Sequence, residues 1–325
     1  MFDIKRYDKN TDRETWNTFI ARSKNGTFLF DRNYMDYHCD RFKDHSLLFY
    51  LNNKLYAVLP ANIEGDAIQS HMGLTYGGLV MGTDATAANI LTLFRELNTY
   101  LALQGIRSVL YKCVPWVYHL VPAEEDLYAI FRTCNARLVA RDIGTVIDMG
   151  HPLRWSRLRR RGIKRATESG VTIEKSKDYA AFWQILSENL NQKYSTTPVH
   201  TIQEIELLHT RFPDNIVLYN AYNKGQLIGG IVIYITPQVV HAQYSSATQL
   251  GKQLGTIDIL YDRIINHDYS DCRYFDFGRS TENRGCYLNE PLIHQKEGFG
   301  GRGLCWDWYE WQVASGERRW DNDEG

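Results

Sequence analysis

The sequence has no long hydrophobic segment and no strong excess of charge. No apolar run approaches the roughly 20 residues of a membrane-spanning helix, and the first residues, MFDIKRYDKNTDRETW, are charged where a signal peptide is apolar. With 37 Lys and Arg against 38 Asp and Glu, the net charge is −1, which argues against a general nucleic-acid binder and against DNA as a partner. We therefore expect a cytoplasmic protein without a membrane span, in which any anion site is local.

Cysteine is also scarce. The six cysteines lie tens of residues apart, with no CxxC motif and no Cys/His cluster at the spacing of zinc ligands. This argues against a disulfide framework, and we predict no metal site. At about 100–200 residues per domain, 325 residues suggest two domains, with one large α/β domain as the alternative.

Two stretches about 170 positions apart show the same order of elements. In the first, a helix carrying Trp16 and Phe19 precedes a hairpin over 46–61 and a third strand-like stretch over 68–76. A helix over 84–103 and the apolar strand RSVLYKC follow.

The second stretch repeats this order. A helix over 179–190 and another that opens with the capping box Thr201/Glu204 precede a hairpin over 216–235, whose turn is Asn-Lys-Gly. A third strand over 241–247, a helix after Gly255 and the strand CRYFDFG follow. We interpret this as a duplication with domains at 1–150 and 151–325; the alternative is that hairpins followed by helices are common in α/β proteins.

A basic connector joins the two halves. From Arg154 to Arg165 seven of twelve residues are basic and none is acidic. Guanidinium groups suit phosphate and carboxylate, so Arg161 and Arg165 are candidate anion contacts. The alternative is a solvated helix that pairs with neighbouring carboxylates.

The region from residue 272, CRYFDFGRSTENRGCYLNEPLIHQKEGFGGRG, is dense in polar residues and follows an apolar strand. Such positions often meet substrate. Asp276 and Glu282 are candidate bases or turn-capping carboxylates, and Lys296 is a candidate oxyanion or phosphate contact or a surface partner of Glu297. Asn289 is a candidate substrate contact.

Further candidates lie upstream. On the third strand of the second half, alternation predicts His241 and Gln243 on one face and Tyr244 on the other. His241 is a candidate base or a structural histidine, and Gln243 and Tyr244 are candidate substrate contacts. His200, before the capped helix, and Tyr76, beside the Gly77-Gly78 turn, are candidates of the same kind.

The order of elements, the connector RRRGIKRATESGV and the tail FDFGRSTENRG…LNEPLIHQKEGFG resemble the FemAB-like branch of the GNAT acyltransferase superfamily, close to GNAT-type proteins of bacterial envelope and capsule gene neighbourhoods. The resemblance implies an α+β fold of two tandem GNAT-like domains, each a twisted, mostly antiparallel sheet flanked by helices. It also implies transfer of an acyl or aminoacyl group to an amine, with no permanently bound cofactor. The family's Phe-Lys lysine falls at Lys296, after Gln295, and its Arg-x-x-x-basic segment falls at Arg161 and Arg165.

The resemblance also suggests where the donor binds. GNAT enzymes that bind CoA carry Gln/Arg-x-x-Gly-x-Gly/Ala at a helix N-terminus, where free N–H groups hold pyrophosphate. Here that stretch is QLGKQLGT, with Lys252 in place of a glycine, so the candidate cofactor-binding residues are Gly251, Lys252, Gly255 and Thr256. In the first half, Lys112–Pro115 stand where the family has an acceptor-binding Asp-Pro.

We therefore predict an N-acyltransferase that uses acyl-CoA as co-substrate and acylates an amino group of an envelope precursor, either an amino sugar or a peptide. Its candidate catalytic residues are Glu282, His241, Asp276 and Lys296. One alternative is a FemAB-type peptidyltransferase that takes its donor from aminoacyl-tRNA and acts on a peptidoglycan precursor; the net charge does not favour it. Another is a non-catalytic protein that binds a glycan or a partner.

Overall fold

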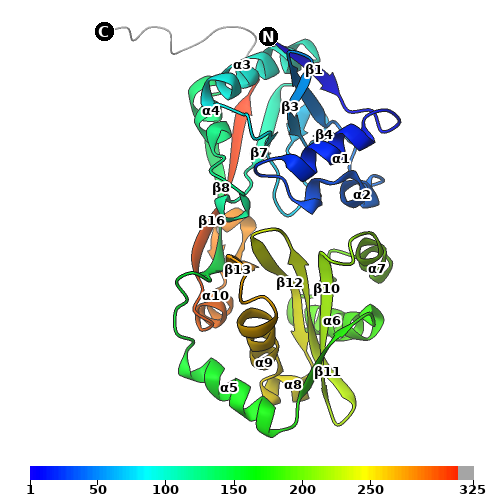
Figure 1. Cartoon of the computed structure of the whole chain (residues 1–325), viewed down its shortest axis with the longest axis vertical. Helices are drawn as coiled ribbons and strands as arrows, with labels where there is room; N and C mark the ends of the chain where they lie inside the picture. Colours follow the sequence, from blue (N-terminus) through cyan, green and yellow to red (C-terminus); the bar gives the residue numbers. More distant parts are fainter. Residues whose placement is uncertain (314–325) are drawn as a thin grey trace. The chain divides into compact units, whose positions relative to one another are not determined.

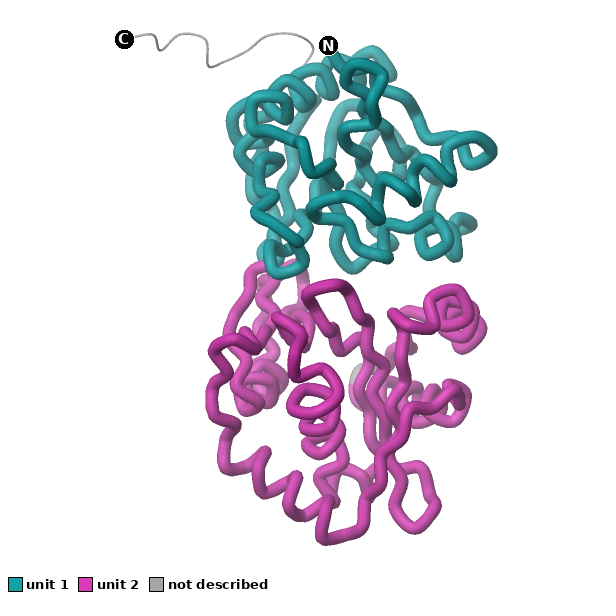
Figure 2. The backbone as a smooth tube through the Cα atoms, in the orientation of Figure 1, with its two compact units in different colours: residues 1–141, 306–325 teal, residues 142–305 magenta. Residues whose placement is uncertain are grey.

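The computed structural model describes residues 1–313, which form two compact units (Figures 1 and 2). Of the described residues, unit 1 comprises Met1–Arg141 and Trp306–Val313, and unit 2 comprises Asp142–Cys305. Both are α+β, with mostly antiparallel sheets and helices beside them, as predicted. The domains predicted at 1–150 and 151–325 differ from these units mainly in the last strand, which joins unit 1 from Trp306.

Unit 1 contains a four-stranded antiparallel sheet of order β1-β2-β3-β6. It also contains β4, β5, β7 and the larger part of β16, which are hydrogen-bonded neighbours in this order, with β5 and β7 parallel. Its strands are β1 (Phe2–Arg6), β2 (Leu47–Leu51), β3 (Lys54–Leu59), β4 (Asn62–Glu64), β5 (Ala67–Gln69), β6 (Val80–Met81), β7 (Ser108–Lys112) and β16 (Arg302–Gln312). Its α-helices are α1 (Arg13–Arg22), α2 (Arg32–Met35), α3 (Ala87–Leu103) and α4 (Glu125–Thr133), with short 3-10 turns at Phe28–Phe30, Asp36–His38 and Trp116–Tyr118.

The predicted hairpins are present in both units. Asn52 and Asn53 connect β2 to β3 with φ of 51° and 62°, and Lys224 and Gly225 make the equivalent turn in unit 2 with φ of 51° and 79°. Two consecutive residues in the left-handed region match the twist of the flanking strands, which is why Asn and Gly occupy such turns.

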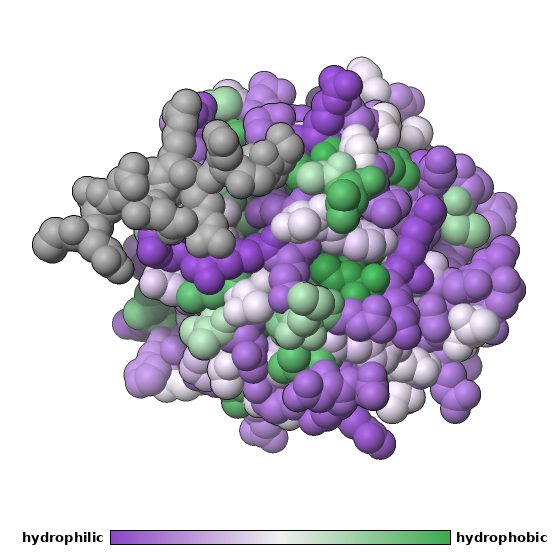
Figure 3. Space-filling model, turned by 90° about the horizontal axis from the view of Figure 1, so that it is seen from above, coloured by the Kyte–Doolittle hydropathy of each residue, from purple (hydrophilic) through white to green (hydrophobic). Residues whose placement is uncertain are grey.

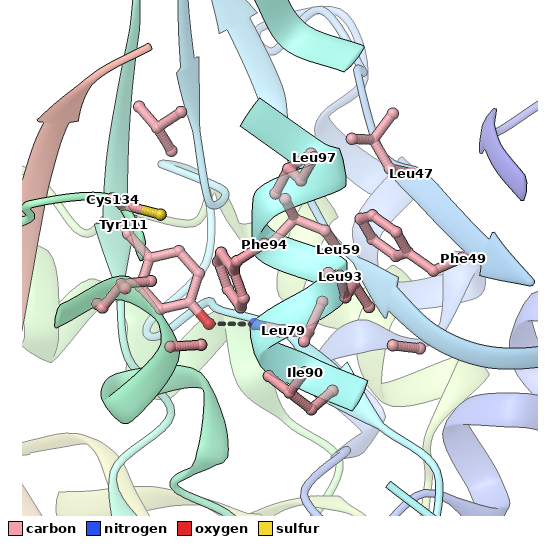
Figure 4. Packing of buried hydrophobic residues seen from close by; sticks show 14 of the residues in the cluster. Leu47, Phe49, Leu59, Leu79, Ile90, Leu93, Phe94, Leu97, Tyr111 and Cys134 are labelled. Carbon is pink, nitrogen blue, oxygen red and sulfur yellow. Dashed lines mark hydrogen bonds between the residues drawn. The ribbon is translucent and has the colours of Figure 1, made fainter. Parts of the chain in front are cut away.

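The core of unit 1 forms around α3. Its buried residues recur at helical spacing and pack against β2, β3 and β7 (Figure 4). They are Ile90, Leu93, Phe94, Leu97 and Leu101. The Tyr111 hydroxyl lies at the edge of this core, where it accepts a hydrogen bond from the Leu79 N–H (2.6 Å) and donates to the Asp126 carboxylate.

Asp126 makes the stability of unit 1 depend on pH. Burial raises the pKa of this carboxyl to about 6 although Tyr111 donates to it. The folded state therefore holds a proton that the unfolded state releases above about pH 4, so stability falls as pH rises from about 4 to 6. A shift of about 2 units corresponds to about 3 kcal/mol.

We expect Asp126→Asn to remove this dependence. Denaturant unfolding at pH 4 and pH 7.5 should show that the wild-type protein loses about 3 kcal/mol relative to the variant between the two pH values. Parallel changes in both proteins would contradict a buried, titrating Asp126. The exposed Asp3→Asn variant is the control.

Unit 2 is built on one sheet, in which β8, β13, β12, β11, β10 and β9 lie in this order. All neighbours are antiparallel except β12 and β13, which are parallel. The strands are β8 (Arg137–Asp148), β9 (Thr172–Ser176), β10 (Ile216–Asn223), β11 (Gln226–Ile235), β12 (Val239–Ala247) and β13 (Tyr274–Arg279), with a separate hairpin of β14 (Thr281–Glu282) and β15 (Tyr287–Leu288). The helices are α5 (Arg157–Glu168), α6 (Tyr179–Tyr194), α7 (Ile202–Arg211), α8 (Gln249–Leu254), α9 (Thr256–Asp262) with a π-helical continuation at Arg263–Asp268, and α10 (Glu290–Glu297), with a 3-10 turn at Asn283–Gly285.

Helices α6 and α9 cover opposite faces of this sheet. Phe182 of α6 packs at Gly230 of β11, whereas the next residue, Ile231, shares a core with Leu260 of α9 and Phe275 of β13. Because successive strand residues point to opposite faces, one face meets α6 and the other meets α9. The predicted capping box of α7 is present, since the Thr201 hydroxyl accepts from the Glu204 N–H and the Glu204 carboxylate accepts from the Thr201 N–H.

The surface shown in Figure 3 consists mainly of hydrophilic residues, with small hydrophobic patches between them. Across residues 1–313, no helix combines the length and the apolar character that crossing a bilayer requires.

Candidate active site

The candidate site lies where two parallel strands separate. β12 and β13 pair at Val239 with Tyr274, Val240 with Phe275 and His241 with Asp276, and their ladder ends there. Beyond this point β12 continues beside β11, and β13 continues beside β8. His241 and Asp276 therefore occupy the last rung before the strands diverge.

The two side chains form a buried pair. His241 Nδ1 lies 2.9 Å from Asp276 Oδ2, and the other carboxylate oxygen accepts the Gly278 N–H at 2.7 Å. Asp276 is fully buried and His241 is 8% exposed. A carboxylate acceptor at Nδ1 favours the tautomer protonated there, so Nε2 keeps its lone pair and can accept a proton.

Gly278 gives the strand end its shape. It has a φ of 73°, and the pairing of β13 with β8 shifts register between Asp276 and Arg279. A Cβ atom at Gly278 would lie 3.1 Å from Cε1 of His241. The position therefore requires both left-handed backbone and the absence of a side chain beside the imidazole.

Lys296 of α10 binds the same glycine residue. Its ammonium donates to the Gly278 carbonyl at 2.9 Å and to the Arg279 carbonyl at 2.6 Å. Burial lowers the pKa of Lys296 to about 8, the negative charge of Asp276 opposes this shift, and Arg279 adds to it. Asp276 binds the N–H of Gly278 and Lys296 binds its carbonyl, so this glycine links three of the four predicted catalytic residues.

We expect Gly278→Ala to disturb this arrangement. Left-handed backbone costs a residue with a Cβ about 1–2 kcal/mol, and the new methyl group would press on the His241 ring. Thermal unfolding should show a loss of stability of this size, and turnover should fall further than the stability loss explains. Gly170→Ala is the matched control, because Gly170 has a φ of 72° and nothing within 4 Å of the added Cβ.

The fourth predicted catalytic residue lies elsewhere in the tail. Glu282 is exposed in β14, and its carboxylate accepts a hydrogen bond from the Asn289 side chain at 3.2 Å. Asn289 caps α10, since its carbonyl oxygen accepts from the Leu292 N–H. The structure therefore places Glu282 and Asn289 with each other, at the junction of the hairpin and α10.

A bulge changes the predicted faces of β12. Val232 pairs with Tyr244 and Ile233 with Ala242, so Gln243 is an extra residue. His241 pairs with Tyr234 and Tyr244 with Val232, and these two β11 residues lie on one face. His241 thus shares its face with Tyr244; the prediction that Tyr244 lies on the opposite face is wrong, because simple alternation omits the bulge.

Tyr244 and His200 form a second buried pair. His200 Nδ1 lies 2.6 Å from the Tyr244 hydroxyl, and Trp183 donates to the His200 carbonyl at 3.1 Å. Burial raises the pKa of Tyr244 to about 12, so the hydroxyl stays neutral. Among the described residues, Oε1 of Gln243 is buried and has no hydrogen-bond partner. His200 thus lies beside the part of β12 that holds Tyr244.

The predicted cofactor-binding residues have packing roles. The Thr248 hydroxyl caps α8 by accepting from the Gly251 N–H at 3.1 Å, and Lys252 donates to Asn189 at 2.6 Å. A Cβ on Gly251 would lie 2.2 Å from the Ile228 carbonyl oxygen, and one on Gly255 2.5 Å from that of Gly162. Thr256 is fully buried. Close packing explains both glycines, and binding of the donor by this segment stays a prediction.

The remaining candidates lie apart from the His–Asp pair. Arg161 and Arg165 are exposed on α5, while Arg159 of the same helix forms a 2.7 Å ion pair with Asp258 of α9. Tyr76 is buried in unit 1, and its hydroxyl lies 2.9 Å from that of Thr27. Among residues 1–313 there is no cluster of three side chains able to hold a metal ion.

Two residues that shape the candidate site, Gly278 and Asp142, were not predicted from the sequence. Gly278 carries a sequence signal, because it follows Asp276 directly within the motif FDFG. Asp142 carries none: it binds Arg279 at 2.9 Å and the Thr281 hydroxyl at 2.7 Å, and so anchors the strand end from a residue far away in the chain.

The chain is similar to known proteins in one domain and in its fold. Residues 156–284 match the family described as acetyltransferase (GNAT) domain. FemX is similar in structure, with a TM-score of 0.66 and 8% identity over 94% of this chain and 96% of that one. L-PGS from Bacillus licheniformis has a TM-score of 0.59 with 11% identity over 96% and 94%. A tandem GNAT protein from the clavulanic acid biosynthesis pathway has a TM-score of 0.52 with 10% identity over 98% and 100%.

Among curated proteins, none matches this sequence. The identities to the solved structures are low, so these likenesses concern the fold, while the domain match covers the half that holds His241 and Asp276. The match and the shared tandem fold confirm the predicted resemblance: the chain has the fold of the FemAB-like branch of the GNAT superfamily, and its second half carries a GNAT-type acyltransferase domain.

Proposed function

We propose that this protein transfers an acyl group to an amine of an envelope precursor, and that the reaction takes place at the diverging ends of β12 and β13. The observation that carries the proposal is the buried His241–Asp276 pair, at 2.9 Å, on the last rung of the parallel ladder. FemX and L-PGS share the fold, which supports an acceptor of the cell envelope, with an amino sugar or a peptide as its amine-bearing part.

In the proposed reaction His241 Nε2 takes a proton from the attacking amine. Asp276 holds the ring and stabilises the imidazolium that forms. The amine nitrogen bonds to the carbonyl carbon of the donor, giving a tetrahedral oxyanion. The carbon–sulfur bond of the thioester then breaks, and the departing thiolate receives the proton from His241.

Lys296 is proposed to stabilise the oxyanion. An ammonium has three N–H donors, and Lys296 uses two of them on the Gly278 and Arg279 carbonyls. The third is left for the developing negative charge. The two backbone acceptors would hold the ammonium in place before substrate arrives.

Unit 2 is the proposed donor-binding half. In unit 1 the matching parallel pair, β5 and β7, ends at Gln69 and Leu110, so the positions of His241 and Asp276 carry no base. Ser70 also joins the two strands past the ladder: its N–H donates to the Leu110 carbonyl at 2.9 Å, and its hydroxyl accepts from the Lys112 N–H at 2.7 Å.

Acyl-CoA is the proposed donor, because residues 156–284 match a GNAT domain and such domains typically use acyl-CoA as co-substrate. A second candidate donor is aminoacyl-tRNA. At the N-terminus of α8 the Gly251 N–H donates to the Thr248 hydroxyl, and the Lys252 ammonium donates to Asn189. These two donors are therefore already engaged and are less available to the pyrophosphate of CoA, which favours the second candidate.

Calorimetric titration with CoA and acetyl-CoA tests the donor. We expect micromolar binding at one site per chain, weakened by Lys252→Ala, with Lys177→Ala as the control for loss of an exposed lysine. Absence of binding to both ligands would remove acyl-CoA. Tight, strongly salt-dependent binding of aminoacyl-tRNA would then support the second candidate, and absence of both would indicate a non-catalytic protein.

A further inference from the structure

Helix α5 presents an exposed row of arginines. Arg157, Arg161 and Arg165 recur every four residues, so they lie above one another on one side of the helix. All three are exposed, as is Arg154 just before the helix. Among the described residues, none of these four guanidinium groups forms an ion pair with a carboxylate. The only acidic residue of α5, Glu168, lies 3.6 Å from Lys164.

The other side of α5 is occupied by the protein. Gly162 and Ala166 are buried, and Gly162 lies so close to Asp258 of α9 that a Cβ there would lie 1.8 Å from the carboxylate. Arg159 pairs with the same carboxylate at 2.7 Å. These contacts fix the rotation of the helix, so Arg157 and Arg161 lie on the side away from α9, while the charge of Arg165 also acts on the Asp258 carboxylate.

Aliphatic side chains accompany the row. Leu158, which is 60% exposed, follows Arg157 about 100° around the helix and lies one turn before Arg161. Leu153, before the helix, is 45% exposed. Exposed leucines beside arginines that form no ion pair match the surface of an anionic bilayer, which is charged outside and apolar beneath. A nucleic-acid backbone offers no apolar layer in which the leucines could be buried.

We propose that α5 docks on the surface of an anionic lipid bilayer, with its arginines at the lipid phosphates and Leu153 and Leu158 in the interface. The helix lies on the membrane and does not cross it. This proposal does not depend on the transferase reaction. The arginines of α5 are a local positive charge in a chain whose net charge is −1. Because the attraction to lipid phosphates is mainly electrostatic, we expect membrane binding to be reversible and to weaken as the salt concentration rises.

Co-sedimentation of the whole protein with vesicles tests the proposal. We expect binding to vesicles of phosphatidylglycerol and phosphatidylcholine at about 0.1 M salt, and none to phosphatidylcholine alone. Arg154→Gln with Arg157→Gln should weaken binding about 30-fold. Lys177→Gln with Lys224→Gln, the same charge change elsewhere in unit 2, should leave it within about twofold of the wild type.

Leu158→Gln separates lipid from nucleic acid. It should weaken vesicle binding about tenfold, because an apolar side chain leaves the interface, and leave any binding of bulk tRNA unchanged. No binding to anionic vesicles, or binding equally weakened by the control pair, would overturn the proposal. Binding of tRNA that depends on Arg154 and Arg157, without vesicle binding, would also overturn it and assign the row to nucleic acid.

Discussion

Replacing His241 with Gln is expected to lower kcat by about 10²- to 10⁴-fold, the usual contribution of a general base. Gln keeps a donor near Asp276 but cannot accept a proton at neutral pH. The measurement is release of free thiol from acyl-CoA in the presence of an amine acceptor, together with circular dichroism to show that the fold is retained. His267→Gln is the control, since His267 also lies near a carboxylate, Asp262 at 3.6 Å, but is exposed.

Asp276→Asn should cause a loss of similar size, and the double variant should lose little more than either single variant. The residues act as one unit, because Asp276 selects the tautomer of His241 and holds the Gly278 N–H. Glu282→Gln should retain near-normal turnover, because its exposed carboxylate binds Asn289. Near-normal turnover of His241→Gln would remove this residue from the mechanism, and a strong loss in Glu282→Gln would shift the base to the hairpin.

Lys296 gives the second large effect, which depends on pH. Its ammonium has a pKa of about 8, lowered by burial, so the positive charge is present below pH 8 and is lost above it. If the charge stabilises the oxyanion, kcat should fall as pH rises through about 8. Lys296→Met should lower kcat about 10²- to 10³-fold at pH 7.

Lys296→Arg identifies the group responsible for this alkaline limb. Arginine remains charged throughout the range, so the remaining activity should no longer decline near pH 8. Binding of CoA, measured separately, should change less than kcat, because the lysine acts on the transition state. An unchanged limb in Lys296→Arg would assign the titration to another group, and full activity in Lys296→Met would exclude the oxyanion role.

Much of the fold could be predicted because the relevant signals are local. Two-residue turns at Asn52-Asn53 and Lys224-Gly225 place the hairpins, and the capping box at Thr201 places the start of α7. Spacing at Ile90, Phe94, Leu97 and Leu101 identifies the buried face of α3. These patterns depend on neighbours within a few positions, so the sequence carries them directly.

The site could be predicted only in part. The sequence identifies His241, Asp276 and Lys296 as separate candidates, but nothing in their spacing indicates that one glycine residue links Asp276 to Lys296. The bulge at Gln243 also escaped prediction, because its presence depends on how β11 pairs with β12. Gly251 and Gly255 show a second limit of the sequence, because a phosphate-loop pattern and a close-packing pattern look alike in it.

Composition and local pattern are thus enough to establish the element order, the repeated arrangement, the basic helix and a short list of reactive side chains. Which of these side chains act together was decided in the tertiary structure. β12 and β13 are separated in the chain by two helices, and only their parallel pairing brings His241 to Asp276. The ladder ends at this pair, after which β12 continues beside β11 and β13 continues beside β8. Such contacts join residues far apart in sequence, so no local pattern records them.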